Sequence, residues 1–442
     1  MNILFNITSP KKYHPLYPFG ERPTEDDVEP DLNNARCFSR TQTTALEGIV
    51  SPGAQDSSVD KCHQKALPNK EGLPTHRELW IRVRQGKMFA LEDAPDDGVS
   101  CLQFSATTSP ILLCSAWDCS LRTYDVSHPS PLRSCVVQPS AALSACFCGG
   151  DEVAATGLVD GAVRLVAMDA LPRVGTDARM GAHAAGVRCL EYAQSLNLLF
   201  SGSWDKTVCA WDPRRRARVV SLSVPGKVFA MAYSANSPKL VVGTADRHVM
   251  IFDARKLDGG DAPLQRGVSS LKHQTRCIRC FPSGEGYALS SIEGRVALEY
   301  FDSEDLGDDD AALKDVSQAD SSRPVARSSR AYGFKCHRAG NVAYPVNALA
   351  FHPTLGTFAT GGTDGYVNLW DGRNKKRLAQ LDQFPTSVAA LTFSKTGSLL
   401  AVASSYAFEE GEKDHPKDQI FIHHTQPFEV TPKANPKPAV TK

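Results

Sequence analysis

A short unit of apolar strands recurs along most of this 442-residue chain, and in most copies its last strand ends in an aspartate. In the first four copies that aspartate stands at positions 125, 169, 212 and 253, which are 44, 43 and 41 residues apart. A period of roughly 40–45 residues is that of one four-stranded blade of a β-propeller. Because a single blade cannot bury both of its faces alone, such a repeat predicts a ring of blades.

Seven copies of the unit can be counted, and they have the signature of WD repeats. The third copy is the clearest, and its strands are expected at Val187–Tyr192, Leu199–Asp205 and Val208–Asp212. The seventh copy, residues 388–423, lacks an outer strand, which Met88–Glu92 would supply from the other end of the repeat region. Pairing the two ends would remove the exposed edge of an open ring. The sequence therefore predicts an all-β fold, a seven-bladed WD-repeat β-propeller over residues 86–430.

Three segments fall outside the repeat pattern. Residues 1–85 are rich in proline and show no sustained period, so we expect a disordered N-terminal extension or a doubtful gene-model extension. The fifth and sixth closing aspartates, at 302 and 371, lie 69 residues apart, which places a mobile insertion loop at about 303–330. Residues 431–442 are expected to form a flexible tail.

The composition excludes several classes of protein. Lys+Arg and Asp+Glu number 49 each, and this balance argues against binding to nucleic acid or to a membrane surface through bulk charge. No apolar run approaches the roughly 18 residues that a membrane span needs. The 13 cysteines are odd in number and scattered, so we expect neither a disulfide framework nor a metal site. We expect a soluble intracellular protein without a cofactor.

The third repeat contains residue types that also form hydrolase triads, namely His183, Ser201, Ser203 and Asp205. In WD repeats the same types satisfy buried polar groups, since the turn aspartate accepts from histidine and serine and the strand tryptophan joins them. The sequence has no Gly-x-Ser-x-Gly elbow and no glycine-rich phosphate loop. We therefore expect a structural blade network and a protein that is not an enzyme. The expected members are His183, Ser203, Asp205 and Trp211.

Binding is expected on the face of the disc that carries the turns after the second strands. Trp117 and Trp204 stand in equivalent positions, each directly before the turn aspartate of its repeat. Each tryptophan could pack over its own blade, or the two could form one apolar platform for a partner segment. Three cations, Arg276, Arg295 and Lys335, lie in and after the fifth repeat. Singly they are typical of solvated surface charges, whereas together they would surround a phosphate with charge-assisted hydrogen bonds.

Several blocks go well beyond the generic repeat, and together they resemble one family. They are Ser269–Arg279, Ser290–Tyr300, Phe334–Arg338, Tyr344–Asn347, Ala359–Asp371 and Ala403–Tyr406. Over roughly residues 88–430 the chain resembles the WD-repeat family of the spindle-assembly checkpoint, the third budding-uninhibited-by-benzimidazole family. The Ser-Ile-Glu-Gly-Arg and Phe-Lys-Cys-His-Arg runs are shared with the Rae/Gle-type mRNA-export WD-repeat factors. The runs Arg276–Pro282 and Leu298–Asp302 look more like the checkpoint branch.

The resemblance implies a scaffold that holds two peptides. One is the GLEBS segment of the Bub-family checkpoint kinases, laid across Trp117 and Trp204. The other is a phosphorylated Met-Glu-Leu-Thr motif of the kinetochore scaffold protein, whose phosphothreonine would meet Arg295 and Lys335. Arg276 would pair with acidic residues of both peptides.

The resemblance also implies recruitment of the mitotic checkpoint complex to unattached kinetochores, and it adds ubiquitin to the expected partners. Neither a membrane nor direct nucleic-acid contact is expected. The expected location is the nucleus, and the kinetochore in mitosis, with a cytoplasmic pool.

Two other functions are compatible with a propeller of this kind. An mRNA-export factor of the nuclear pore would bind a GLEBS segment from a nucleoporin and would concentrate at the nuclear rim. A cullin ubiquitin-ligase substrate receptor is suggested by aromatic-Asp-x-Arg motifs, although arginine there is also common as a solvated turn residue. These motifs are Trp211–Arg214, Phe252–Arg255 and Trp370–Arg373.

Overall fold

The computed structural model describes residues 88–128, 130–168, 178–257, 262–301 and 330–433. The expected N-terminal extension, residues 1–85, lies outside the described residues. The same holds for residues 303–329 of the expected insertion loop and for residues 434–442 of the expected tail.

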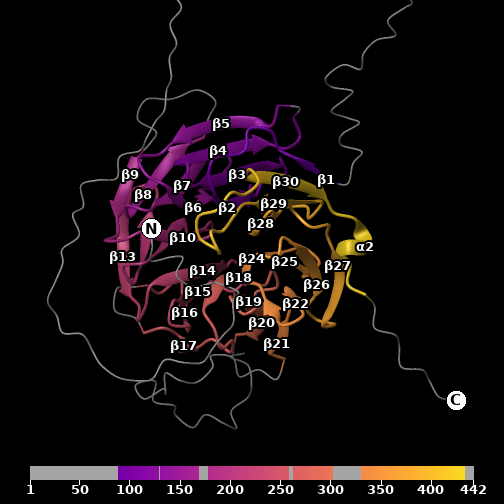
Figure 1. Cartoon of the computed structure of the whole chain (residues 1–442). Helices are drawn as coiled ribbons and strands as arrows, with labels where there is room; N and C mark the ends of the chain where they lie inside the picture. Colours follow the sequence, from indigo (N-terminus) through magenta and orange to yellow (C-terminus); the bar gives the residue numbers. More distant parts are fainter. Residues whose placement is uncertain (1–87, 129, 169–177, 258–261, 302–329, 434–442) are drawn as a thin grey trace, which may run out of the picture. The chain divides into compact units, whose positions relative to one another are not determined.

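Seven four-stranded antiparallel sheets form a ring, which confirms the predicted all-β seven-bladed propeller (Figure 1). The first three blades are β2 (Val99–Phe104), β3 (Ile111–Ala116), β4 (Ser120–Asp125) and β5 (Leu132–Val137); β6 (Ala142–Phe147), β7 (Val153–Leu158), β8 (Ala162–Ala167) and β9 (Ala178–Ala182); and β10 (Val187–Ala193), β11 (Leu198–Ser203), β12 (Thr207–Asp212) and β13 (Ala217–Ser223).

The next three blades repeat this strand order. They are β14 (Val228–Ser234), β15 (Lys239–Thr244), β16 (His248–Asp253) and β17 (Gln265–Val268); β18 (Thr275–Cys280), β19 (Gly286–Ser291), β20 (Arg295–Tyr300) and β21 (Tyr332–Lys335); and β24 (Val346–Phe351), β25 (Phe358–Gly362), β26 (Val367–Asp371) and β27 (Lys376–Gln380). A two-stranded hairpin, β22 (Arg338–Ala339) and β23 (Val342–Ala343), links blades 5 and 6.

The seventh blade joins the two ends of the repeat region. It consists of β28 (Val388–Phe393), β29 (Leu399–Ser404), β30 (Gln419–His424) and β1 (Met88–Ala90). Strand β1 pairs with β30, so that Met88 lies opposite His423 and Ala90 opposite Phe421. Figure 1 shows β1 beside β30, where the indigo and yellow ends of the ring meet. The prediction that the residues after Met88 close the ring is confirmed.

The hydrophobic core is divided among the blade interfaces. Each of the seven pairs of neighbouring blades shares one cluster of buried apolar side chains. Close approach depends on a small residue near the end of the second strand, as the repeat pattern suggests. A Cβ atom on Gly202 would lie 2.6 Å from a methyl of Val228 in the next blade. Sequence and packing thus agree that blades stabilise one another in pairs.

The first strand of every blade has a β-bulge at its second residue, and this feature shapes the central channel. The register shifts fall at Ser100, Leu143, Arg188, Phe229, Arg276, Asn347 and Ala389. A bulge leaves one residue without a ladder partner and redirects its side chain. Six of the seven bulge residues line the cavity described below, so the bulges set the chemistry at the channel mouth.

A short helix, α2 (Pro427–Val430), packs on blade 6 after the last strand. No helix in the described part of the chain is long and apolar enough to cross a membrane. The cysteines that the structure describes are all free thiols, and five of them are buried, namely Cys114, Cys146, Cys189, Cys209 and Cys336.

Candidate functional site

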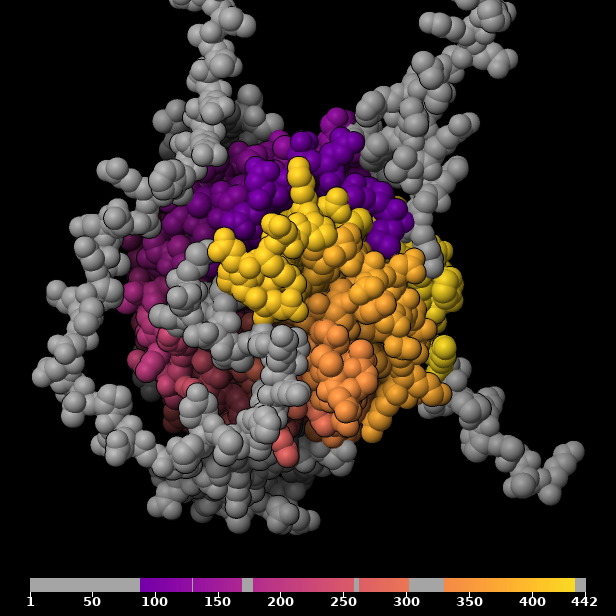
Figure 2. All heavy atoms as spheres, viewed as in Figure 1, coloured from indigo at the N-terminus to yellow at the C-terminus, as the bar shows by residue number. Residues whose placement is uncertain are grey.

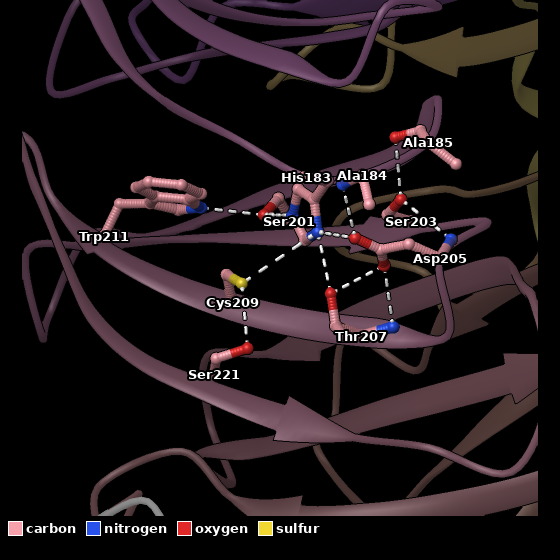
Figure 3. Close-up of polar contacts among 10 residues, drawn as sticks. All are labelled: His183, Ala184, Ala185, Ser201, Ser203, Asp205, Thr207, Cys209, Trp211 and Ser221. Atoms are coloured by element: carbon pink, nitrogen blue, oxygen red, sulfur yellow. Dashed lines mark hydrogen bonds and ion pairs between the residues drawn. The ribbon is translucent and has the colours of Figure 1, made fainter.

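Blade 3 contains a closed hydrogen-bond network that fixes the turn between β11 and β12 (Figure 3). Nδ1 of His183 lies 3.1 Å from Asp205 Oδ2 and 2.8 Å from Thr207 Oγ1. Nε2 of the same ring lies 2.7 Å from Ser201 Oγ, which also accepts the indole N–H of Trp211 at 2.7 Å. The imidazole therefore connects the turn to the middle of the blade.

Ser203, an expected member of the network, takes a different place in it. Its hydroxyl donates to the Ala185 carbonyl at 2.9 Å and accepts the backbone N–H of Asp205 at 3.1 Å. Ser201 is the serine that links histidine and tryptophan, and it is completely buried. Since the hydroxyl is enclosed and already bonded on both sides, this geometry suits a structural link.

The two charged members of this network have opposite pKa shifts. Burial by itself lowers the pKa of His183, but hydrogen bonding to Cys209 and the charge of Asp205 outweigh burial and raise it. Burial raises the pKa of Asp205, but hydrogen bonds from Thr207 and from a backbone N–H outweigh burial and lower it. Both shifts favour the charged forms, so the pair stabilises the turn.

Blade 6 contains an equivalent network that the sequence analysis missed. His337 Nδ1 lies 2.9 Å from Asp364 Oδ1, and its Nε2 lies 2.7 Å from Thr360 Oγ1. The indole N–H of Trp370 donates to the same threonine oxygen at 3.0 Å. The available signal is a tryptophan ten residues after a buried hydroxyl residue, since Ser201 and Trp211 have the same spacing.

The ends of the seven sheets that carry the turns between second and third strands, such as Trp204–Lys206, form what we call the turn face. Here Trp117 and Trp204 line one cavity of about 280 Å³ at the mouth of the central channel. Each indole ring also packs on the segment that leads into the first strand of its own blade. A Cβ atom added to Gly98 would lie 3.3 Å from the Trp117 ring, and one added to Gly186 would lie 2.8 Å from the Trp204 ring. The two interpretations of these tryptophans are therefore compatible. The buried indole N–H of Trp204 has no acceptor among the described residues, so a ligand could take it.

Another wall of the cavity is the loop of residues 405–418, which joins β29 to β30. Tyr406 and Phe408 line the cavity from this loop. The Tyr406 hydroxyl donates to the Gly411 carbonyl at 3.0 Å and accepts the Glu410 N–H at 2.9 Å, while Asp418 accepts the Tyr406 N–H at 3.1 Å. Yellow atoms of the C-terminal part of the ring stand over the middle of the molecule in Figure 2. The loop is thus held by its own bonds against the channel mouth.

Two arginines at equivalent bulges, Arg188 in blade 3 and Arg276 in blade 5, line the same cavity. The Arg276 guanidinium donates to Asn347 Oδ1 from Nε at 3.2 Å and from Nη2 at 3.0 Å. Burial and the neighbouring charge of Arg188 lower the pKa of Arg276 to about 10, and the charge of Glu409 opposes this effect. Arg276 thus has a neutral amide as its hydrogen-bond partner and a second cation, Arg188, beside it, and this arrangement favours an anionic ligand.

Arg295 and Lys335 come together at the outer part of blade 5. They lie directly opposite each other in the β20–β21 ladder. On the other side of β20, Arg295 lies opposite Ser291 of β19. Ser291 in turn lies opposite Thr275 of β18, the residue directly before Arg276. The register therefore brings all three predicted cations to the turn-face end of one sheet, with Arg276 on its inner strand and Lys335 on its outer strand.

Glu293 is the carboxylate that lies beside Arg295, and the sequence analysis gave it no role. By register it takes the place of Asp205, and Arg295 takes the place of Thr207. Its carboxylate accepts the Lys272 N–H at 3.2 Å and lies 3.5 Å from Arg295 Nε. The buried Nε of Arg295 has no hydrogen-bond partner among the described residues. Where blade 3 has the neutral Thr207, blade 5 therefore has the cation Arg295, and the Nε–H of Arg295 is not used in a hydrogen bond to any described residue.

The local charge at this turn is positive. Arg338 donates to the backbone carbonyl of Glu293 at 2.7 Å, and His273 Nε2 lies 3.9 Å from its carboxylate. Arg295 and His273 therefore lie within 4 Å of the Glu293 carboxylate, and the side chains of Lys272, Lys335 and Arg338 add positive charge at the same turn. In the part of the chain that the structure describes, no group of three or more His, Cys, Asp or Glu side chains could hold a metal ion.

Sequence reasoning missed Arg188, Tyr406, Phe408, Arg338 and Glu293. The signal for Arg188 is its position, since it is the second residue of the first strand of its blade, as Arg276 is in blade 5. The loop aromatics carry no such signal, because residues 405–418 have no counterpart in the other repeats.

Comparison with known proteins agrees with the fold and identifies close relatives. The profile of the WD domain, G-beta repeat, matches residues 176–212, 218–253 and 329–371. The solved "Structure of U3-55K" is similar, with a TM-score of 0.62 at 16% identity, covering 77% of this chain and 98% of that one. At this level of identity the likeness concerns the fold alone.

Three relatives are similar over most of their length. The "Mitotic checkpoint protein BUB3.1" of Arabidopsis thaliana is 46% identical over 360 residues, covering 79% of this chain and 96% of the relative. The "Mitotic checkpoint protein bub3" of Dictyostelium discoideum is 40% identical, covering 76% and 94%. The "Poly(A)+ RNA export protein" of Schizosaccharomyces pombe is 30% identical, covering 77% and 91%.

Proposed function

The chain belongs to the Bub3 family of mitotic checkpoint proteins and has a role in the spindle checkpoint, and we propose that it acts there by binding two peptides on its turn face. One peptide is the GLEBS segment of a Bub-family checkpoint kinase. The other is a phosphorylated Met-Glu-Leu-Thr motif of the kinetochore scaffold protein. Holding both at once would recruit the checkpoint complex to unattached kinetochores.

The cavity at the channel mouth supports the kinase-peptide part of the proposal. Trp117 and Trp204 provide apolar area, and the unpaired indole N–H of Trp204 offers a donor to a peptide carbonyl or carboxylate. Arg188 and Arg276 lie in the same cavity and would pair with acidic side chains of the bound segment. The aromatic and cationic groups together fit an acidic, partly apolar peptide.

The blade 5 turn supports the phosphopeptide part of the proposal, and it is the observation that carries the assignment. Arg295 and Lys335 are cross-strand neighbours at the same sheet end as Arg276. A phosphothreonine brings about −1.5 to −2 charges and makes roughly one to three charge-assisted hydrogen bonds that threonine cannot make. The phosphate would bridge Arg295 and Lys335, while the acidic flank of the peptide would approach Arg276.

The test is isothermal titration calorimetry of the full chain with phosphorylated and unmodified Met-Glu-Leu-Thr peptides. Arg295→Ala with Lys335→Ala should abolish the preference for the phosphorylated peptide, a loss on the order of 2–4 kcal/mol. The control is Arg373→Ala with Lys395→Ala. It removes two exposed cations from the face of the propeller opposite to the turn face and should leave the preference intact. Equal binding of both peptides by the wild-type protein would refute the assignment.

A second experiment separates the two peptide sites. Trp204→Ala should weaken binding of the GLEBS peptide while the phosphopeptide preference persists, because Trp204 lies in the blade 3 wall of the cavity. Unchanged GLEBS affinity in a folded Trp204→Ala protein would contradict the placement of that peptide.

In this proposal the protein is a non-catalytic scaffold of the nucleus that concentrates at kinetochores in mitosis. Live imaging of a fluorescent fusion tests the location. Signal on unattached kinetochores supports the proposal, whereas a rim signal at the nuclear pores in interphase favours the mRNA-export alternative.

A further inference from the structure

A basic turn lies on blade 3, between β12 and β13. The sequence there is Pro213-Arg-Arg-Arg-Ala-Arg218, and all four arginines are exposed. The side chains of Arg214 and Arg215 are 77% and 83% exposed. We call residues 213–218 the arginine turn.

The carboxylate that faces the arginine turn is Asp212, and the turn's backbone already engages it. Its Oδ1 accepts the N–H of Arg214 at 2.9 Å and that of Arg215 at 3.4 Å. The two guanidinium groups lie 3.7 and 3.6 Å away. Arg216 and Arg218 make no hydrogen bond or ion pair with any residue that the structure describes. One carboxylate therefore leaves most of the turn's positive charge uncompensated.

The arginine turn lies at the other end of blade 3 from the peptide cavity. In the β12–β13 ladder, Asp212 pairs with Ala217 at the arginine turn, whereas Thr207 pairs with Ser223 at the end that carries Trp204. Blade 4 packs beside blade 3 through a shared apolar cluster and adds exposed Arg255 and Lys256 in its corresponding turn. The patch is thus a separate feature from the site proposed above.

In the corresponding turns of other blades, basic residues make contacts that stabilise the fold. In blade 4, Arg255 bonds Asp253 with two nitrogens, at 2.9 and 2.8 Å. In blade 6, Lys375 Nζ lies 4.4 Å from the ring centre of Tyr332. The arginine turn differs because Arg216 and Arg218 have no partner among the described residues, while Arg214 and Arg215 share the carboxylate of Asp212 and Arg214 also donates to the side-chain oxygen of Asn197. Stability does not account for four arginines at this place, since clustered like charges repel.

We propose that the arginine turn binds the phosphodiester backbone of a nucleic acid. Guanidinium groups match phosphate oxygens with paired, charge-assisted hydrogen bonds, and the turn offers four of them within five residues. Contacts of this kind are independent of base sequence and strongly dependent on salt.

The zero net charge of the chain, from which we expected no nucleic-acid contact, does not decide this point. At physiological ionic strength charges are screened over about 8 Å, so a strand at blade 3 responds to the local arginines and hardly to acidic residues elsewhere. The proposal is independent of the peptide sites.

The test is fluorescence anisotropy of the full chain with a labelled single-stranded RNA and a labelled DNA duplex, measured over a series of salt concentrations. The variant carries Arg214→Gln, Arg215→Gln and Arg218→Gln, exposed positions at which glutamine should not disturb the fold. We expect at least a tenfold loss of affinity at low salt. We also expect a log–log salt slope shallower by about two, since each phosphate contact contributes roughly 0.7–0.9.

The matched control carries Arg373→Gln, Lys375→Gln and Lys376→Gln, which removes the same charge from the corresponding turn of blade 6. It should retain most of the affinity, and the arginine-turn variant should bind the phosphopeptide normally. An equal loss in both variants, or no binding by the wild type at low salt, overturns the proposal. Displacement of the RNA by polyglutamate as effectively as by unlabelled RNA of equal charge also overturns it, since the ligand would then be an acidic polypeptide.

Discussion

Asp205 and His183 make the stability of blade 3 dependent on pH in two directions. The pKa of Asp205 is lowered in the fold, so its contribution is present above its unfolded value near 3.9 and is lost as pH falls through the folded value. The pKa of His183 is raised, so its contribution is full below about 6.5 and is lost as pH rises through the folded value. The pair therefore stabilises the blade most between about pH 5 and 6.

Asp205→Asn should lower the free energy of unfolding by about 1.5–3 kcal/mol in that pH window, because the new amide cannot accept from all the donors that surround it. The deficit should shrink below pH 4 and above pH 7. Urea unfolding across pH 3–8 measures this. The control is Asp160→Asn in blade 2, where the turn aspartate accepts the Ala162 N–H but makes no hydrogen bond or ion pair with a histidine among the described residues. A deficit that is constant with pH would show that the ion pair has no part in it.

At the scale of residues, sequence reasoning located side chains better than it located their partners. Trp117, Trp204 and Arg276 were predicted from repeat position, and the structure gathers them around one cavity. Arg188 was missed although it holds the same position in its blade as Arg276. Glu293 was missed because its role depends on which residues of other strands face it. A repeat pattern predicts where a residue lies in its blade, whereas neighbours across the channel follow only from ring closure.

At the scale of strands, the glycine near the end of β11 controls how closely blades 3 and 4 approach. Gly202→Ala should destabilise the protein by about 1–3 kcal/mol, because the new methyl would lie 2.6 Å from Val228 Cγ1 in a fully buried interface. Thermal and urea unfolding measure the loss. Gly150→Ala is the matched control, since a Cβ atom there meets nothing within 4 Å, and it should be neutral or slightly stabilising. Equal stabilities of the two variants would contradict the packing argument.

The loop of residues 405–418 sets an acidic group against the cationic channel mouth. Glu409 accepts a hydrogen bond from Ser387 Oγ, and its charge acts on Arg276. Glu409→Gln should therefore tighten binding of an acidic GLEBS peptide by roughly three- to tenfold and make that binding more sensitive to salt.

Calorimetry at two salt concentrations tests this prediction. Glu412→Gln on the same loop is the control, because that side chain is exposed and should change affinity little. Weaker peptide binding by Glu409→Gln would indicate instead that the carboxylate holds the loop in the shape that the peptide needs.

The regular elements of the fold were predictable from the sequence, and the irregular ones were not. The 41–44 residue spacing of the terminal aspartates predicted the blades, and Met88–Glu92 was correctly paired with the seventh copy. The loop between β29 and β30 has no counterpart in the other repeats, and the seven bulges recur at one position but carry different residue types. Six of the bulge residues and this loop line the binding cavity, so the periodic pattern predicts the scaffold while the chemistry of the cavity comes from what varies between the repeats.

At the scale of the whole molecule, stability depends on closure of the ring. Each blade shares one apolar cluster with each neighbour, so opening a single interface leaves two blades with an uncovered side. The ring is closed within the seventh blade by β1, which has three residues and is the shortest of the blade strands. Loss of β1 would expose the edge of β30.

Replacing Met88–Leu91 with Gly-Ser-Gly-Ser tests this dependence. Leu91 is 5% exposed, and its N–H donates to the Ile420 carbonyl at 2.7 Å, so the replacement removes a buried side chain together with the β1–β30 ladder. We expect a loss of about 2–5 kcal/mol in urea unfolding. We also expect self-association through β30 on size-exclusion chromatography with light scattering. The same replacement at residues 106–109, an exposed turn of blade 1, should leave a monomer of nearly wild-type stability. If the β1 variant stays monomeric with an unchanged unfolding midpoint, the seventh blade is stable with three strands, and the ring does not depend on the strand that joins its ends.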